Sequence, residues 1–224
     1  MMPEIDLAED HQAIVAGAFR LVFRRAGDRW THDLERRVRG EPAFATFARS
    51  FEGDPDRDDP EIVVSPAYQQ ITLQEAGPGT IQALLVGQSG PHHFSAVFEF
   101  TREILPRPDD WPHAEEPGRV RIKVDVADRC RSSVRALAAT YRLAATSGDL
   151  AESSTASGPI GMAWDLGPDR LAFAAAEPAR VAFAEDGRRG TRVQAVAALR
   201  PAESTHRWTY DWAWEPDARP RTRP

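Results

Sequence analysis

The chain has 224 residues and a formal net charge of −6, from 28 Lys and Arg against 34 Asp and Glu. This length fits one large β domain or two small ones. The sequence has no basic stripe that could neutralise a phosphate backbone, which argues against a nucleic-acid partner. No apolar run approaches the ~18 residues of a membrane-spanning helix, so we expect no membrane partner.

The basic residues and the single cysteine indicate where such a protein works. Lys123 is the only lysine among the 28 basic residues, which we interpret as the codon bias of a GC-rich bacterial genome. Cys130 is the only cysteine, so no disulfide can form within the chain, and this favours a reducing compartment. The N-terminus lacks the apolar region of a signal peptide. We therefore expect a cytoplasmic bacterial protein.

Two segments near the N-terminus alternate apolar and polar residues. Phe19, Leu21 and Phe23 fall on one side of an extended chain over 18–25, and the pattern continues over 29–35 after a short turn. Alternation with a period of two on both sides of a turn is typical of a β-hairpin. We therefore predict two antiparallel strands here.

Residues 41–53 carry a different period. Phe44, Phe47 and Phe51 recur at intervals of three and four, and Gly53 ends the run. Such intervals place side chains on one face of an α-helix. We therefore predict one short helix at this point.

Alternation with a period of two returns further along the chain. We predict strands within 61–77, with a break near Pro66, and over 80–87, 92–103 and 119–128. Each of these segments is bounded by residues that favour turns, which is typical of antiparallel neighbours.

Two segments leave alternatives open. Residues 106–118 contain four prolines and predict either a domain boundary or a long crossover. Residues 132–146 fit both a helix and a strand. We favour the strand because the pair Thr140 and Tyr141 suits a pleated surface and a clear strand precedes it.

The C-terminal part continues with short strands and ends in a run of rings. Short strands are predicted over 159–200, and the segment HRWTYDWAWE follows at 206–215. Every second residue of this segment carries a ring; these residues, the ring stripe, are His206, Trp208, Tyr210, Trp212 and Trp214. All five rings share one face of a strand, whereas a helix would scatter them. The proline- and arginine-rich residues 216–224 predict a disordered tail.

Ten or more short strands with many turns and one short helix predict an all-β fold. The expected architecture is a mostly antiparallel β-sandwich or barrel. We expect a single β-rich domain over 1–215. The alternative is a two-part organisation into 1–105 and 119–215, joined by 106–118.

The ring stripe has two interpretations. Buried aromatic rings remove much apolar surface from water, so the stripe favours the core of a sheet. The second interpretation is a stacking platform for a flat ligand, and it makes ligand-binding candidates of Trp208, Tyr210, Trp212 and Trp214. Companion residues on the same inner surface are Phe94, Phe98 and Phe100.

Catalytic candidates gather in one predicted strand. His92 and His93 are adjacent, so they point to opposite faces and cannot readily share a metal ion. His93 and Ser95 share a face, which makes a Ser–His pair conceivable, although the spacing of a nucleophile elbow is missing. Cys130 has no partner base in the sequence. No P-loop, dinucleotide fingerprint, HExxH or CxxC motif occurs, so we expect no metal and no cofactor.

These observations favour a non-catalytic binding or scaffolding protein with an aromatic-lined interior. Its partner would be a small apolar or aromatic ligand, or another protein. The alternative is a hydrolase-like enzyme with a site near His92, His93 and Ser95. A third hypothesis is a structural homo-oligomer in which exposed strand edges pair with copies of the same chain.

Overall fold

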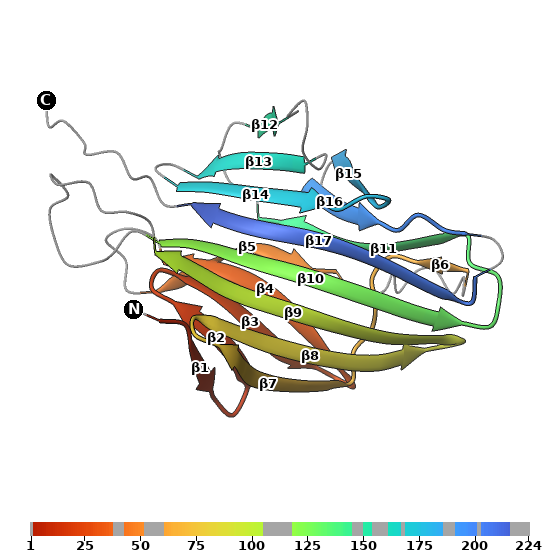
Figure 1. Ribbon diagram of the computed structural model, residues 1–224, viewed down its shortest axis with the longest axis horizontal. Helices are drawn as coiled ribbons and strands as arrows, with labels where there is room; N and C mark the ends of the chain where they lie inside the picture. Colours follow the sequence, from red (N-terminus) through yellow and green to blue (C-terminus); the bar gives the residue numbers. More distant parts are fainter. Residues whose placement is uncertain are drawn as a thin grey trace, which may run out of the picture.

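The computed structural model describes residues 2–37, 43–51, 61–104, 118–144, 150–153, 161–166, 169–185, 191–200 and 203–215, and these form an all-β structure (Figure 1). The strands make two sheets, one of nine strands and one of eight. Neighbouring strands are antiparallel apart from one short parallel pair. The predicted all-β, mostly antiparallel fold is therefore confirmed.

The nine-stranded sheet gathers the N-terminal strands and three later ones. Its order is β1 (Glu4–Leu7), β2 (His11–Ala16), β3 (Phe19–Ala26), β4 (Arg29–Arg37), β5 (Phe44–Ser50), β11 (Ala136–Leu143), β16 (Thr191–Val196) and β15 (Arg180–Glu185). The short strand β6 (Ile62–Val63) pairs with β11 in parallel. The predicted hairpin is present as β3 and β4, and the ambiguous segment 132–146 forms the strand β11.

The eight-stranded sheet contains the long strands from the middle of the chain. Its order is β12 (Leu150–Ser153), β13 (Gly161–Leu166), β14 (Asp169–Ala175), β17 (Thr205–Glu215), β10 (Gly118–Cys130), β9 (His92–Ile104), β8 (Thr80–Ser89) and β7 (Gln70–Gly77). Both sheets thus include strands from either side of residues 106–118, and β9 pairs with β10 across that segment. Residues 106–117, parts of the segment 159–200 and the tail 216–224 lie outside the described residues.

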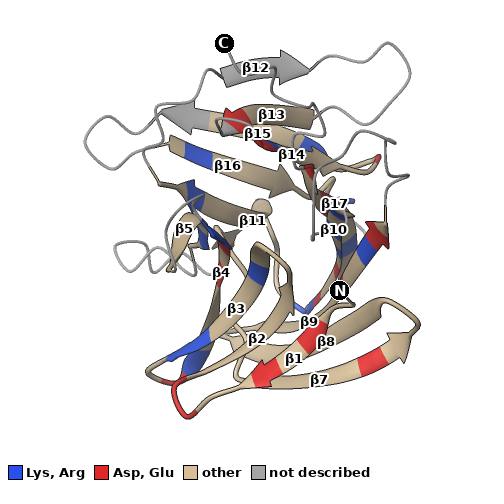
Figure 2. Ribbon diagram, turned by 90° about the vertical axis from the view of Figure 1, so that its left-hand side faces the viewer, with Lys and Arg blue, Asp and Glu red and all other residues tan. Residues whose placement is uncertain are grey.

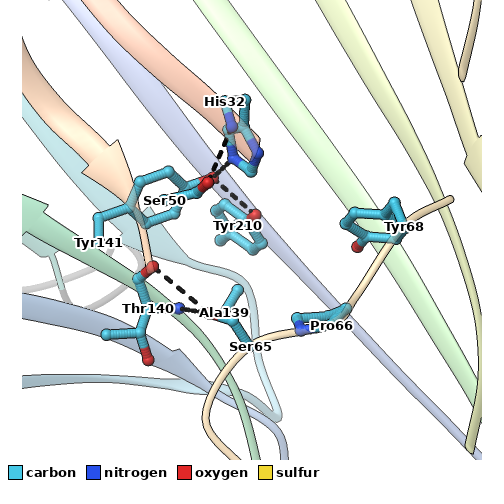
Figure 3. Close-up of a pocket in the computed structure, with 9 residues that line it drawn as sticks. All are labelled: His32, Ser50, Ser65, Pro66, Tyr68, Ala139, Thr140, Tyr141 and Tyr210. Carbon is cyan, nitrogen blue, oxygen red and sulfur yellow. Dashed lines mark hydrogen bonds between the residues drawn. The ribbon is translucent and has the colours of Figure 1, made fainter. Parts of the chain in front are cut away.

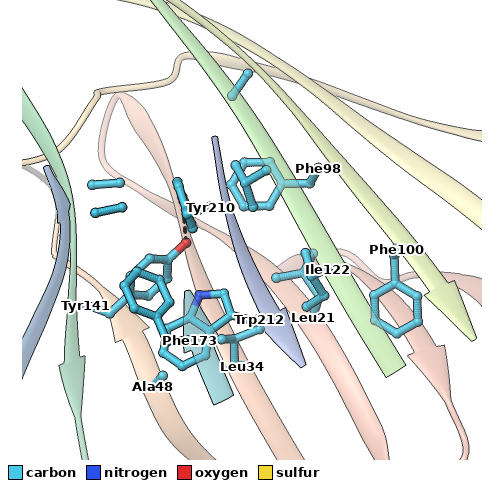
Figure 4. Close-up of a cluster of buried hydrophobic side chains, with 14 of the residues drawn as sticks. Leu21, Leu34, Ala48, Phe98, Phe100, Ile122, Tyr141, Phe173, Tyr210 and Trp212 are labelled. Carbon is cyan, nitrogen blue, oxygen red and sulfur yellow. Dashed lines mark hydrogen bonds between the residues drawn. The ribbon is translucent and has the colours of Figure 1, made fainter. Parts of the chain in front are cut away.

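The two sheets face each other and enclose the core (Figure 2). Inward-facing residues alternate with outward-facing ones along the central strands, as in β10, where Val120, Ile122, Val124 and Val126 are buried. Rings and aliphatic side chains from both sheets meet between them; among these Tyr141 and Leu34 come from one sheet, and Phe98 and Trp212 from the other (Figure 4). Burial of this apolar surface stabilises the sandwich.

Among the described residues, no helix is both long enough and apolar enough to cross a membrane.

The helix predicted at 41–53 is wrong, because its described part is the strand β5. The three phenylalanines that suggested a helix do not share one face of the sheet. Leu34 of β4 pairs with Ala48, while the next residue, Glu35, pairs with Thr46, so Phe47 is an extra residue in β5. This β-bulge turns both Phe47 and Ala48 towards the core. Phe44 and Phe51 instead lie under the guanidinium groups of Arg20 and Arg142. Their intervals of three and four therefore imitate a helix without marking one apolar face.

The outer face of the nine-stranded sheet holds two buried carboxylates. Glu35 is bonded by Arg20, whose Nη2 lies 2.6 Å from Oε2, and by Arg24, whose Nη2 lies 2.9 Å from Oε1. Asp33 receives two hydrogen bonds from Arg49, each 2.9 Å long. These hydrogen bonds raise the pKa of the Arg49 guanidinium. The carboxylates are tolerated in an apolar setting because each is paired.

Candidate functional site

A pocket lies between the sheets and opens beside β4 and β11 (Figure 3). We call it the Tyr–His pocket; its lining residues are His32, Ser50, Ser65, Pro66, Tyr68, Ala139, Thr140, Tyr141 and Tyr210. The pocket encloses about 210 Å³ of empty space, its open mouth included. The closed cavity itself is only about 10 Å³, room for about one water molecule, so a larger ligand could enter only if the lining residues moved apart.

A chain of hydrogen bonds crosses between the sheets at this pocket. His32 Nε2 lies 2.7 Å from the hydroxyl oxygen of Tyr141, and that oxygen lies 2.8 Å from the hydroxyl oxygen of Tyr210. His32 and Tyr141 belong to the nine-stranded sheet, and Tyr210 belongs to the eight-stranded one. All three side chains are buried. Hydrogen bonds among buried groups are well shielded from water, so this chain fixes the three rings relative to one another.

Aromatic contacts hold the histidine ring in place. The imidazole of His32 meets the ring of Phe98 edge to face at 4.8 Å and the ring of Tyr141 at 5.3 Å. The Ser50 hydroxyl oxygen accepts a hydrogen bond from the backbone N–H of His32 at 2.8 Å. The histidine is therefore positioned through both its backbone and its side chain.

One wall of the pocket is a polar contact between an irregular segment and β11. The Ser65 hydroxyl accepts a hydrogen bond from the backbone N–H of Thr140 at 2.8 Å, and the Thr140 hydroxyl donates to the backbone oxygen of Val64 at 2.6 Å. Gln194 of β16 donates a further hydrogen bond to the Thr140 hydroxyl. Hydroxyl groups therefore replace part of a regular strand ladder at this place.

The segment 64–69 closes the pocket by reaching both sheets. The backbone N–H of Trp30 in β4 donates to the oxygen of Tyr68 at 2.7 Å, and the N–H of Gln69 donates to the oxygen of Val86 in β8 at 3.0 Å. This crossing passes so close to Gly87 that an added Cβ would lie 2.1 Å from the backbone oxygen of residue 67. Gly87 therefore allows the segment to lie where it lines the pocket.

The ring stripe forms β17 and faces the core. Trp208, Tyr210, Trp212 and Trp214 are all buried, and Trp212 packs with its ring centroid 4.5 Å from that of Phe173. Tyr210 is the member of the stripe that also lines the Tyr–His pocket. The companion residues are likewise buried on the inward face of β9; they are Phe94, Phe98 and Phe100.

Several indole N–H groups of this interior have no acceptor among the described residues. They belong to Trp164, Trp208, Trp212 and Trp214. A buried donor without an acceptor costs roughly 1–3 kcal/mol, so these groups are available to an oxygen atom that enters the interior.

The three catalytic candidates do not converge. His92 faces inward and is buried, whereas His93 and Ser95 face outward and are exposed. The structure instead brings His92 next to two residues of β10. His92 Nδ1 hydrogen bonds with Asp128 Oδ2 at 2.9 Å, and His92 Nε2 lies 3.9 Å from Cys130 Sγ.

Metal ligands do not gather in the described part of the chain. Within those residues, no group of three or more His, Cys, Asp or Glu side chains is arranged to hold a metal ion.

In comparisons with known proteins, no family model matches this sequence, and no curated protein is significantly similar to it. Two groups of buried polar residues remain as candidate sites. One is the Tyr–His pocket, and the other is His92 with Asp128 and Cys130.

The sequence alone marked few residues of the Tyr–His pocket, and it singled out His92 and Cys130 without bringing them together. His32 alternates with Trp30 and Leu34, so its polar ring at an apolar position of the strand was a usable signal. Asp128 and Cys130 continue the inward series of β10 in the same way. No comparable signal marked Ser65 or Thr140, because their contacts arise from the packing of an irregular segment against β11.

Proposed function

We propose that this chain is a non-catalytic binding protein whose ligand is a small aromatic molecule that carries an oxygen. The proposed binding site is the Tyr–His pocket. The observation that carries the proposal is the hydrogen-bonded chain of His32, Tyr141 and Tyr210, which spans the two sheets at the pocket. It sets phenol and imidazole groups at fixed positions beside an opening.

The lining explains the choice of ligand class. Three tyrosine rings and Pro66 supply flat apolar walls, while the hydroxyls of Ser50, Ser65 and Thr140 supply polar contacts. A site with apolar walls and a few placed polar groups suits a small ring with one polar substituent. The cavity as it stands has room for about one water molecule, so the proposal requires the lining segment 64–69 to move when a ring enters.

Polar groups of the lining support an oxygen on the ligand. The Tyr210 hydroxyl and the His32 imidazole both line the pocket, and groups of this kind can bind a ligand oxygen. We also propose that the protein works in the cytoplasm of a bacterium. Its single cysteine, Cys130, is free, which favours a reducing compartment. The predominance of arginine over lysine supports a bacterial source with a GC-rich genome.

The tyrosines provide a direct test. The chain has three tyrosines, and all of them line the pocket. Protein labelled with 3-fluorotyrosine should therefore give three fluorine resonances that all report on this site. Titration with phenol should shift them in a saturable way, whereas resonances that stay fixed with phenol and with related hydroxylated rings would refute the proposal.

A matched pair of variants assigns the effect to the pocket. Tyr210→Phe removes one hydroxyl from the lining and should weaken phenol binding about fivefold to tenfold, the loss expected for one hydrogen bond. Thr209→Val removes a hydroxyl from the adjacent residue, which faces outward and bonds Asp125 instead. This control should leave phenol binding unchanged.

A further inference from the structure

A second cluster lies on the inward face of the eight-stranded sheet, at the end where β9 begins and β10 ends. Cys130 is directly opposite His92 in the pairing of these strands, and Asp128 is two residues earlier on the same face of β10. The imidazole of His92 thus stands between a carboxylate at Nδ1 and a thiol at Nε2, at 2.9 and 3.9 Å. Each ring nitrogen has its own partner.

We propose that Cys130, His92 and Asp128 form a reactive-thiol site. The carboxylate of Asp128 accepts a hydrogen bond from the Nδ1–H of His92, so the lone pair of Nε2 faces the sulfur. The thiol proton can then move to Nε2, which leaves a thiolate beside an imidazolium. Because the proton moves from Cys130 to His92 within the cluster, the net charge of the cluster stays the same. The step therefore avoids the free-energy cost of adding a net charge to a buried site.

Burial decides which reagents can react. Cys130 is 2% exposed, His92 is 1% exposed and Asp128 is 0% exposed. A peptide or another protein cannot reach such a sulfur, whereas a reagent the size of hydrogen peroxide can enter through small fluctuations. The proposed oxidant is therefore a small peroxide.

Two further buried atoms point to a small polar ligand beside the thiol. Asp128 Oδ1 and His206 Nδ1 have no hydrogen-bond partner among the described residues. His206 is directly opposite Asp128 in the pairing of β10 with β17, and both side chains face inward. A peroxide that approaches Cys130 would find a hydrogen-bond acceptor at Asp128 and a second polar contact at His206.

The reaction balances with the groups that are present. The thiolate sulfur of Cys130 attacks one oxygen of hydrogen peroxide, and a sulfur–oxygen bond forms as the oxygen–oxygen bond breaks. Sulfur is oxidised to a sulfenic acid and the peroxide is reduced. The departing hydroxide takes the proton from Nε2 of His92 and leaves as water, which returns the imidazole to its neutral form.

The single cysteine makes the test simple, because every thiol modification of the full chain reports on Cys130. Native protein and protein unfolded in urea are exposed to hydrogen peroxide at the same pH for the same times, with Cys130→Ser as the blank. The peroxide is then removed, and both samples are unfolded in urea with dimedone, so that the trapping reagent can reach every sulfenic acid. The dimedone adduct, counted by intact mass, should form faster from the native chain. A native thiol that reacts no faster than the unfolded one would overturn the proposal.

Variants separate the role of the imidazole from that of the fold. His92→Asn should lower the rate of sulfenic acid formation about tenfold to a hundredfold, as expected for loss of a general base. His11→Asn is the matched control, since His11 also contacts an aspartate, at 2.7 Å, but belongs to β2 of the other sheet. A folded His92→Asn variant with the rate of the native chain would likewise refute the proposal. If that variant does not fold, the comparison of native with unfolded protein decides alone.

Discussion

Tyr141 and Tyr210 belong to opposite sheets and share a hydrogen bond 2.8 Å long between their hydroxyl oxygens. Both side chains are buried, so this polar contact lies inside an otherwise apolar interface. The same Tyr141 hydroxyl also bonds His32. One oxygen atom therefore links side chains of three strands, β4, β11 and β17.

Removal of that oxygen should destabilise the protein more than removal of its neighbour. Tyr141→Phe ends two buried hydrogen bonds and should lower the free energy of unfolding by about 2–3 kcal/mol. Tyr210→Phe ends the bond to Tyr141 but leaves the bond between Tyr141 and His32, and should cost about 1 kcal/mol. Urea denaturation of both variants measures the difference. Equal losses would show that the Tyr141 hydroxyl does not act as the shared link.

The central tryptophan of the ring stripe should contribute mainly through packing. Trp212 is 1% exposed and its ring centroid lies 5.0 Å from that of Tyr141 and 6.1 Å from that of Trp164. Trp212→Ala should lower the free energy of unfolding by about 3–5 kcal/mol. A loss below about 1 kcal/mol in denaturant unfolding would contradict its place in the core.

A conservative change at the same site tests the unpaired indole. Trp212→Phe keeps a ring and removes a buried N–H that has no acceptor among the described residues. Part of the lost apolar contact is therefore offset by relief of an unsatisfied donor, and the variant should lose only about 1 kcal/mol. A loss close to that of the alanine variant would mean that the N–H is satisfied in solution.

The buried carboxylate of Glu35 should stabilise the outer face of its sheet. Its side chain is 4% exposed, while the paired side chains of Arg20 and Arg24 are 21% and 34% exposed. Glu35→Gln leaves two cations that water can still partly hydrate, so the cost should be about 1–3 kcal/mol, below that of a fully buried broken pair. In the control Glu203→Gln, which alters an exposed pair with Arg200, the midpoint of denaturation should scarcely move.

The close approach at Gly87 should be sensitive to one methyl group. Gly87→Ala would place its Cβ 2.6 Å from the Cα of Tyr68, so the segment 64–69 must shift. Overpacking of this kind typically costs about 1–3 kcal/mol. The fluorine resonance of labelled Tyr68 should move as well. Ser89→Ala, whose side chain is exposed in the same strand, should leave both stability and spectrum unchanged.

The sequence predicted the strands well wherever alternation was unbroken. β17 and β10 are examples, because one face of each is buried along its full length and the period of two is therefore complete. β5 was mistaken for a helix because its rings recur at helical intervals, although the bulged Phe47 faces the core while Phe44 and Phe51 lie against arginine side chains. A bulge depends on the partner strand, and sequence periodicity contains no information about the partner.

The candidate sites were less predictable than the strands. His92 and Cys130 are 38 residues apart, and they meet because β9 and β10 pair in one particular register. A shift of that register by one residue would turn one of them outward. The Tyr–His pocket depends on even more distant partners, since His32 and Tyr141 are 109 residues apart. Polar residues at inward positions were the usable signal in both cases.

The position of β17 has a consequence for the order of events during synthesis. Within the eight-stranded sheet, β17 lies between β10 and β14 and follows both of them in the chain. Until it emerges from the ribosome, β7 to β10 and β12 to β14 form two separate pieces, and the edges of β10 and β14 that pair with β17 stay open. Such edges readily pair with other chains. A nascent chain halted before residue 205 should therefore depend on chaperones, and the ring-bearing strand should complete the sheet in a single late insertion.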